Sequence, residues 1–135
     1  MLGENIGNLS GKIIGTRVLA CEGRGPGIEV TIQESGKLLG VEANNIGTYK
    51  SHVLPGGGYA GDGQGILTSK DGDTATWHAT GVGHPTGKGQ AVNWRGALYF
   101  STTSSKLSRL NGTCVIFEHD CDENGNTSSK LSEWR

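Results

Sequence analysis

The sequence is poor in proline, in charge and in hydrophobic residues, and these shortages narrow the class of protein. Only 3 of its 135 residues are Pro, which argues against a proline-rich disordered chain. Charged residues make up 19 % and hydrophobic residues 33 %, both low for a globular domain. We expect one domain over residues 1–135 with a modest core, and residues 1–10 loosely ordered.

The chain also lacks an excess of basic charge and lacks long apolar runs. Its net charge of -1 and pI near 6.4 supply no electrostatic footprint for a nucleic acid. No stretch is long enough to cross a bilayer, and Met1 to Asn5 lack the basic start of a secretory signal. We therefore expect a cytoplasmic protein with no nucleic-acid or membrane partner.

Metal-binding and disulfide patterns are missing as well. The cysteines are Cys21, Cys114 and Cys121, an odd number without CxxC spacing, which favours reduced thiols buried as small hydrophobes. The histidines are His52, His78, His84 and His119, with neither an HxH nor an HExxH pattern. The sequence therefore predicts no metal site and no cofactor.

One segment does resemble the start of a calcium-binding loop. Residues 120–126 place oxygen-bearing side chains at alternate positions and Gly at the sixth, as an EF-hand does. The twelfth position is Leu131 rather than Glu, and both flanks have strand character. We expect a β-turn there, with a calcium site as the alternative.

Glycine is abundant, at 24 residues, and it marks turns between short strands. Asp71–Gly72 and Asn124–Gly125 predict two-residue hairpin turns. The first sets Ile66 opposite Trp77, and the second sets Glu118 opposite Leu131. A third turn at Ser35–Gly36 is predicted to join residues 27–33 to 38–41, with Glu34 facing Lys37.

These turns, together with looser loops at 55–58 and 85–89 and a first strand over 12–22, give eight or nine strands. Ser104 as an N-cap and Asn111–Gly112 as a stop predict one short helical turn near 104–110. A chain this short removes its sheet edges most simply by closure. The expected fold is all-β, a single antiparallel eight-stranded meander barrel.

A row of glycines leaves one strand face without side chains. Gly61, Gly63 and Gly65 alternate with larger residues, which fits a sharp bend or the close approach of a large side chain or a ligand. The hairpin register predicts His78 opposite Gly65 and Thr80 opposite Gly63.

The residues around this row carry a family resemblance. The run 61–66, Asp71–Gly72–Asp73, Thr76–Trp77, Trp94–Arg95–Gly96 and the turn at 107–112 resemble small bacterial β-barrels of the allene oxide cyclase-like and AttH-like type, within the calycin architecture. The resemblance spans roughly residues 11–135. It implies a largely apolar barrel cavity with a few polar groups, and it transfers no catalytic residue to this chain.

Strand alternation proposes a candidate site. It places Arg95 and Tyr99 on one face of the 92–101 strand, and Trp94, Leu98 and Phe100 on the other. The predicted C-terminal hairpin adds Glu118 and Glu133 to the face of Arg95. Either these groups anchor a ligand, with a glutamate as acid or base, or they form an ordinary surface ion pair.

The candidate residues follow from these faces. The catalytic candidates are Arg95, Glu118, His78 and Tyr99. The ligand-binding candidates are Gln64, His78, Trp94, Arg95, Tyr99, Glu118 and Glu133. The aromatic residues Trp77, Trp94, Tyr99, Phe100, Phe117 and Trp134 are expected to pack in the core or to form a pocket wall.

Three functions remain open at this stage. The leading hypothesis is a barrel that binds a small apolar or amphipathic molecule in its interior. The first alternative is an isomerase or cyclase that acts on such a molecule. The second is a structural protein that forms a homo-oligomer through its outer face.

Overall fold

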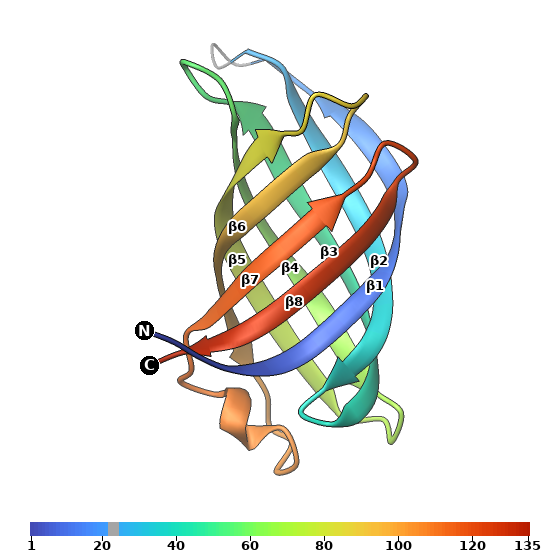
Figure 1. Ribbon diagram of the computed structural model, residues 1–135. Coiled ribbons are helices and arrows are strands. Elements are labelled where there is room, and N and C mark those ends of the chain that lie inside the picture. Colours follow the sequence, from blue (N-terminus) through green and yellow to red (C-terminus); the bar gives the residue numbers. More distant parts are fainter. Residues whose placement is uncertain (22–24) are drawn as a thin grey trace.

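The chain closes into one antiparallel barrel, as the sequence predicted. The computed structural model describes residues 1–21 and 25–135. Neighbouring strands pair in sequence order, and the first pairs with the last (Figure 1). The described strands are β1 (Leu2–Leu19), β2 (Gly27–Leu38), β3 (Val41–Val53), β4 (Tyr59–Ser69), β5 (Thr74–Pro85), β6 (Val92–Ser101), β7 (Val115–Cys121) and β8 (Asn126–Trp134). No described helix is long and apolar enough to cross a membrane.

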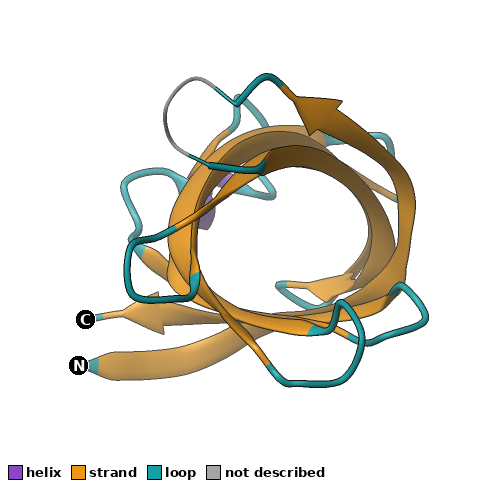
Figure 2. Cartoon of the chain, turned by 90° about the horizontal axis from the view of Figure 1, so that it is seen from above, coloured by secondary structure: helices purple, strands orange, loops and turns teal. Residues whose placement is uncertain are grey.

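The barrel interior has two unlike halves. Seen along the axis, the strands surround a single interior, with the 3-10 turn η1 (Ser108–Leu110) at one end (Figure 2). We call this the lower end, as in Figure 1. Leu107 and Leu110 are 1 % exposed, and they pack in the hydrophobic core with the inward-facing residues in the lower part of the barrel. The core comprises Ile6, Leu9, Leu38, Ala43, Leu67, Ala75, Ala79, Leu98, Phe100, Leu107, Leu110, Val115 and Leu131.

The first strand begins far earlier than expected. Residues 2–10, which we expected to be loosely ordered, belong to β1 and pair with β8, while residues 7–19 pair with β2. Pairing with β8, joined from Gly7 onward by pairing with β2, satisfies backbone groups of the segment and orders it. Glu22, the predicted end of the first strand, lies outside the described residues.

Two hairpins form where predicted but in a different register. At both, a three-residue loop replaces the expected two-residue turn: Ser69 N–H donates to Asp73 O at 2.8 Å, and Asp122 N–H donates to Asn126 O at 2.9 Å. Only the glycine of each loop has a positive φ, as in a type I turn followed by a bulge.

One extra loop residue shifts the pairing by one position, which exchanges the two faces of a strand. Trp77 therefore pairs with Gly65 rather than Ile66, and His78 pairs with Gln64. In the C-terminal hairpin, Leu131 pairs with Phe117 rather than Glu118. The predicted facing of the glycine row by His78 and Thr80 is wrong for the same reason.

The turn predicted at Ser35–Gly36 is also wrong. These residues continue β2, and the chain reverses at Leu39–Gly40, where φ is 52° and 75°. Leu39 packs against the core, and its N–H donates to Ile6 O at 2.8 Å, so tertiary contacts override the poor turn propensity of leucine. Glu34 consequently pairs with Asn45 across β2 and β3, and does not face Lys37.

The helical turn is present as η1, shorter than the predicted segment. Its N-cap is Leu107, without a capping side chain, so the prediction of Ser104 as N-cap is wrong. Alternation along β6 is confirmed: Trp94, Leu98 and Phe100 are buried, while Arg95 and Tyr99 lie on the outer face. Tyr99 and Trp134, expected in the core, are 45 % and 53 % exposed.

Candidate functional site

Two tryptophan rings lie over the glycine row on the inner face of β4. A Cβ atom at Gly61 would stand 2.7 Å from Cζ3 of Trp94, and one at Gly65 would stand 2.5 Å from Nε1 of Trp77. Gly47, on β3, faces the same Trp77 ring. The bare face therefore accommodates indole rings that arrive from β5 and β6, one of the two outcomes that the glycine spacing predicted.

An interior cavity of about 80 Å³ remains beside these rings. Its wall is mainly carbon, with Leu67, Leu98 and Leu131 toward the lower end and Trp94 toward the upper end. Gly61 and Gly63 on β4 and Gly81 on β5 form a part of the wall that has no side chains. The volume is about half that of an engineered cavity of roughly 150 Å³ that binds benzene.

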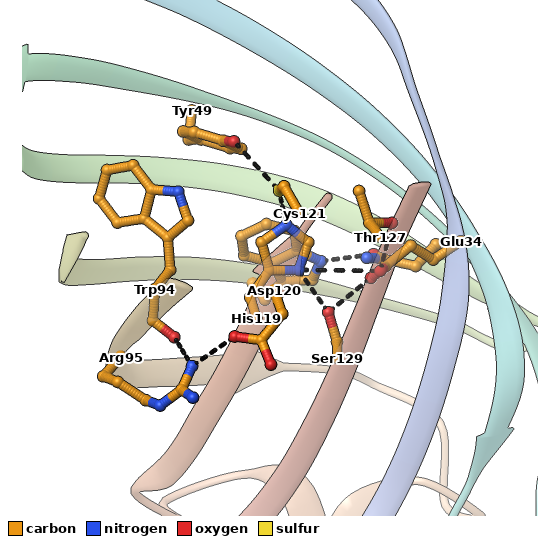
Figure 3. Close-up of polar contacts among 11 residues, drawn as sticks. Glu34, Tyr49, Trp94, Arg95, His119, Asp120, Cys121, Thr127 and Ser129 are labelled. Carbon is orange, nitrogen blue, oxygen red and sulfur yellow. Dashed lines mark hydrogen bonds and ion pairs between the residues drawn. The ribbon is translucent and has the colours of Figure 1, made fainter. Parts of the chain in front are cut away.

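A chain of polar side chains lines the opposite wall (Figure 3). Glu34 on β2 is 2 % exposed, and its two carboxyl oxygens accept hydrogen bonds of 2.7 Å from Thr127 Oγ1 and Ser129 Oγ on β8. His119 Nδ1 on β7 lies 2.6 Å from the same Ser129 Oγ, and 3.7 Å from Glu34 Oε2. The carboxyl group and the imidazole are thus linked through one hydroxyl.

The other ring nitrogen of His119 faces a thiol. Cys121 Sγ lies 3.4 Å from His119 Nε2, and the hydroxyl of Tyr49 on β3 lies 4.0 Å from the same sulfur. The ring of Tyr49 meets Trp94 edge-on at 5.4 Å between centroids. The upper half of the interior therefore joins a polar chain to an aromatic cluster.

The hydrogen bonds fix the direction of donation along this chain. Ser129 donates its only hydroxyl proton to Glu34, so His119 Nδ1 must carry the proton that reaches Ser129 Oγ. Burial lowers the pKa of His119, which keeps the ring neutral near pH 7. Nε2 is then the acceptor that faces the thiol of Cys121.

Burial also keeps the other two groups of the chain protonated. It raises the pKa of Cys121 to about 11, and it raises the pKa of Tyr49 above its usual value. A thiol and a phenol in this state donate weak to moderate hydrogen bonds and carry no charge. The arrangement suits a neutral molecule better than a charged one.

Most of the predicted site residues lie elsewhere. Gln64, His78, Arg95, Tyr99 and Glu118 are on the outer face of the barrel, because the interior holds the alternate residues of β4 to β7. None of them lines the interior cavity. Of the predicted ligand-binding residues, only Trp94 does.

The predicted charge cluster is divided between two places. Arg95 pairs with Glu118 at 3.9 Å and with Asp120 at 2.7 Å on the outer face, where all three side chains are 40 % exposed or more. Pairs as exposed as these contribute about 0–1 kcal/mol. Glu133, whose face was inverted by the register shift, is buried near the lower end, where Arg109 donates to its Oε1 at 2.8 Å.

His78 and Gln64 border a different feature, a shallow depression on the outer face. Ile46, Ile66 and Tyr99 lie along it, each 45 % exposed or more, and the rings of His78 and Tyr99 are 5.7 Å apart. No Asp, Glu, Lys or Arg is among the described residues that form it.

The loop at 120–126 is a self-contained turn. Asp122 Oδ1 accepts hydrogen bonds of 2.8 Å from the backbone N–H groups of Asn124 and Asn126, and Asn126 Nδ2 donates to Oδ2 at 2.9 Å. These bonds lower the pKa of Asp122. The described residues contain no group of three or more His, Cys, Asp or Glu side chains that could hold a metal ion.

The fold and the interior define the protein as a small closed β-barrel, eight-stranded and antiparallel, with a polar chain against one wall of an apolar cavity. No protein-family model and no curated protein matches the chain.

Solved structures of bacterial proteins do match, over nearly the whole chain. A conserved protein of unknown function from Rhodopseudomonas palustris has a TM-score of 0.82 and 11 % identity, and the match covers 98 % of this chain and 97 % of that one. A protein of unknown function from Clostridium acetobutylicum has a TM-score of 0.83 and 13 % identity, and the match covers 98 % of this chain and 97 % of that one. A β-barrel-like protein from Acinetobacter baumannii has a TM-score of 0.83 and 14 % identity, and the match covers 100 % of this chain and 96 % of that one. These TM-scores establish a shared fold.

Proposed function

We propose that the protein binds one small, mainly apolar molecule in the interior cavity. The observation that carries this proposal is the space of about 80 Å³ beside Trp77 and Trp94. Protein interiors are close-packed, with few voids larger than a water molecule, and a carbon-lined void gains dispersion contacts when an apolar molecule fills it. The resemblance to allene oxide cyclase-like barrels, which implies an apolar cavity with a few polar groups, supports the same function.

Isobutene is a suitable probe, since it is small, branched and uncharged. Methyl resonances of Leu67, Leu98 and Leu131, which line the cavity, are expected to shift in carbon–proton NMR spectra as isobutene is added. Ala79→Leu adds three carbon atoms at the cavity wall and should abolish these shifts. Ala97→Leu makes the same change on the outer face of β6 and serves as the matched control.

Overpacking costs about 1–3 kcal/mol, so each variant is first compared with the wild type in urea unfolding. Binding outside the cavity would give equal shifts in wild type and Ala79→Leu. That result, or the absence of methyl shifts in the wild type, would refute the proposal.

A further inference from the structure

A second polar feature of the cavity is separate from the chain that begins at Glu34. Asn45 lies on β3, is 6 % exposed and lines the cavity. Its Oδ1 accepts a hydrogen bond of 2.7 Å from Trp77 Nε1. An indole N–H is a donor only, so this bond fixes the amide orientation: the oxygen faces Trp77, and the nitrogen faces elsewhere.

The amide nitrogen of Asn45 has no hydrogen-bond partner within residues 1–21 and 25–135. It is not sealed in the packing either, because Ser104 Oγ is the only fully enclosed side-chain nitrogen or oxygen in that part of the chain without a partner. The nitrogen is thus a donor at the cavity wall that a bound molecule can satisfy.

The charges around the cavity limit what that molecule can be. Glu34 lies directly across from Asn45 in the β2–β3 register, and it also lines the cavity. No Lys or Arg is among the described lining residues. A carboxylate placed at Asn45 would meet the carboxyl group of Glu34 with no cation to offset it.

We propose that Asn45 determines ligand specificity, and that its Nδ2 donates a hydrogen bond to the oxygen of a small neutral carbonyl compound held in the cavity. This inference rests on the proposed function and adds the chemical class of the ligand. The apolar part of the molecule lies against Leu98 and Leu131, and the carbonyl points toward β3.

Three molecules of nearly the same shape test the inference. Acetone presents a carbonyl oxygen, isobutene replaces that oxygen with a methylene group, and acetate replaces one methyl group with a charged oxygen. In the wild type, acetone is expected to shift the side-chain amide protons of Asn45 and the Nε1 proton of Trp77. Isobutene should shift the resonances of the cavity methyl groups with little effect on those of the Asn45 amide. Acetate should shift neither set of resonances.

One variant removes the donor: Asn45→Leu takes away the amide without adding charge. It should weaken acetone binding by about tenfold and isobutene binding by less than about twofold, the size expected for one lost hydrogen bond. Asn44→Leu makes the same change on the outer face of the same strand and is the control.

The outcomes separate the two proposals. If isobutene does not enter the wild-type cavity, the proposed function fails. If isobutene enters but acetone does not shift the resonances of the Asn45 amide protons, or if Asn45→Leu weakens the binding of acetone and isobutene equally, only the role of Asn45 is overturned. The comparison of the three molecules on the wild type decides the question even where a variant does not fold.

Discussion

Replacing Gly65 with alanine tests how the glycine row positions the tryptophans. The new Cβ would stand 2.5 Å from Trp77 Nε1 and still closer to the ring carbons, so the indole must move. Its displacement strains the packing by about 1–3 kcal/mol. It also breaks the Trp77–Asn45 hydrogen bond, worth about 1 kcal/mol. We expect a loss of about 2–4 kcal/mol in the free energy of unfolding, or roughly 10 °C in Tm.

The assay is urea unfolding followed by circular dichroism and tryptophan fluorescence. Gly15→Ala is the control, because a Cβ there meets nothing within 4 Å and φ is not positive. That change should stabilise the protein by up to about 1 kcal/mol, through the lower entropy of the unfolded chain.

A double-mutant cycle isolates the clash itself. In a Trp77→Leu background, Gly65→Ala should cost less than about 1 kcal/mol, because the smaller side chain leaves room for the new methyl group. An equal cost with and without Trp77, or a Gly65→Ala variant as stable as Gly15→Ala, would refute the reasoning.

Three further predictions concern titratable groups. Burial lowers the pKa of His119 in the folded protein, so the unfolded chain binds this proton at a higher pH than the folded protein does, and stability falls below about pH 6.5. The urea midpoint of His119→Gln should therefore change less between pH 7 and 5.5 than that of the wild type. Arg109 lowers the pKa of Glu133, so the stability from this pair is present above about pH 4.5 and is lost as the pH falls further. The Tm of Arg109→Met should therefore fall less between pH 5 and 3 than the Tm of the wild type. A thiol-reactive disulfide reagent at pH 8 should label exposed Cys21 within minutes and buried Cys121 only after unfolding in guanidinium, with mass spectrometry locating the label.

The strand number, the meander order and the closure of the barrel could be predicted from the sequence because each rests on turn spacing and chain length. The register could not. Asp71–Gly72 suits either a two-residue turn or a three-residue loop with a bulge, and the two differ by one residue in pairing. The same one-residue difference at Asn124–Gly125 inverted the predicted faces of Leu131 and Glu133, while β6, which needed no turn assignment, was placed correctly.

The polar chain in the interior was not predicted from the sequence, first because the turn beside Glu34 was misplaced, and second because the sequence does not specify the register of β8. Glu34 was placed beside a turn at Ser35–Gly36, whereas Gly36 is in β2, where a side chain would overlap the backbone of Asn8. A signal for His119 did exist. Alternation from Phe117, which was assigned to the aromatic face, places His119 and Cys121 on the same face without any assumption about the next turn. The contacts with Ser129 depend on the register of β8, which the sequence does not specify.

The pairing of β1 with β8 has a consequence for biosynthesis. All the other strand pairs join strands that are neighbours in sequence, so each of these hairpins is able to form soon after its residues leave the ribosome. One edge of β1 has no partner until residues 126–134 have been made. An unpaired edge is a template for association with other chains, and the long segment of β1 carries this risk throughout synthesis. The same closing step that gives the finished barrel no free edge therefore exposes the nascent chain to aggregation until its last strand arrives.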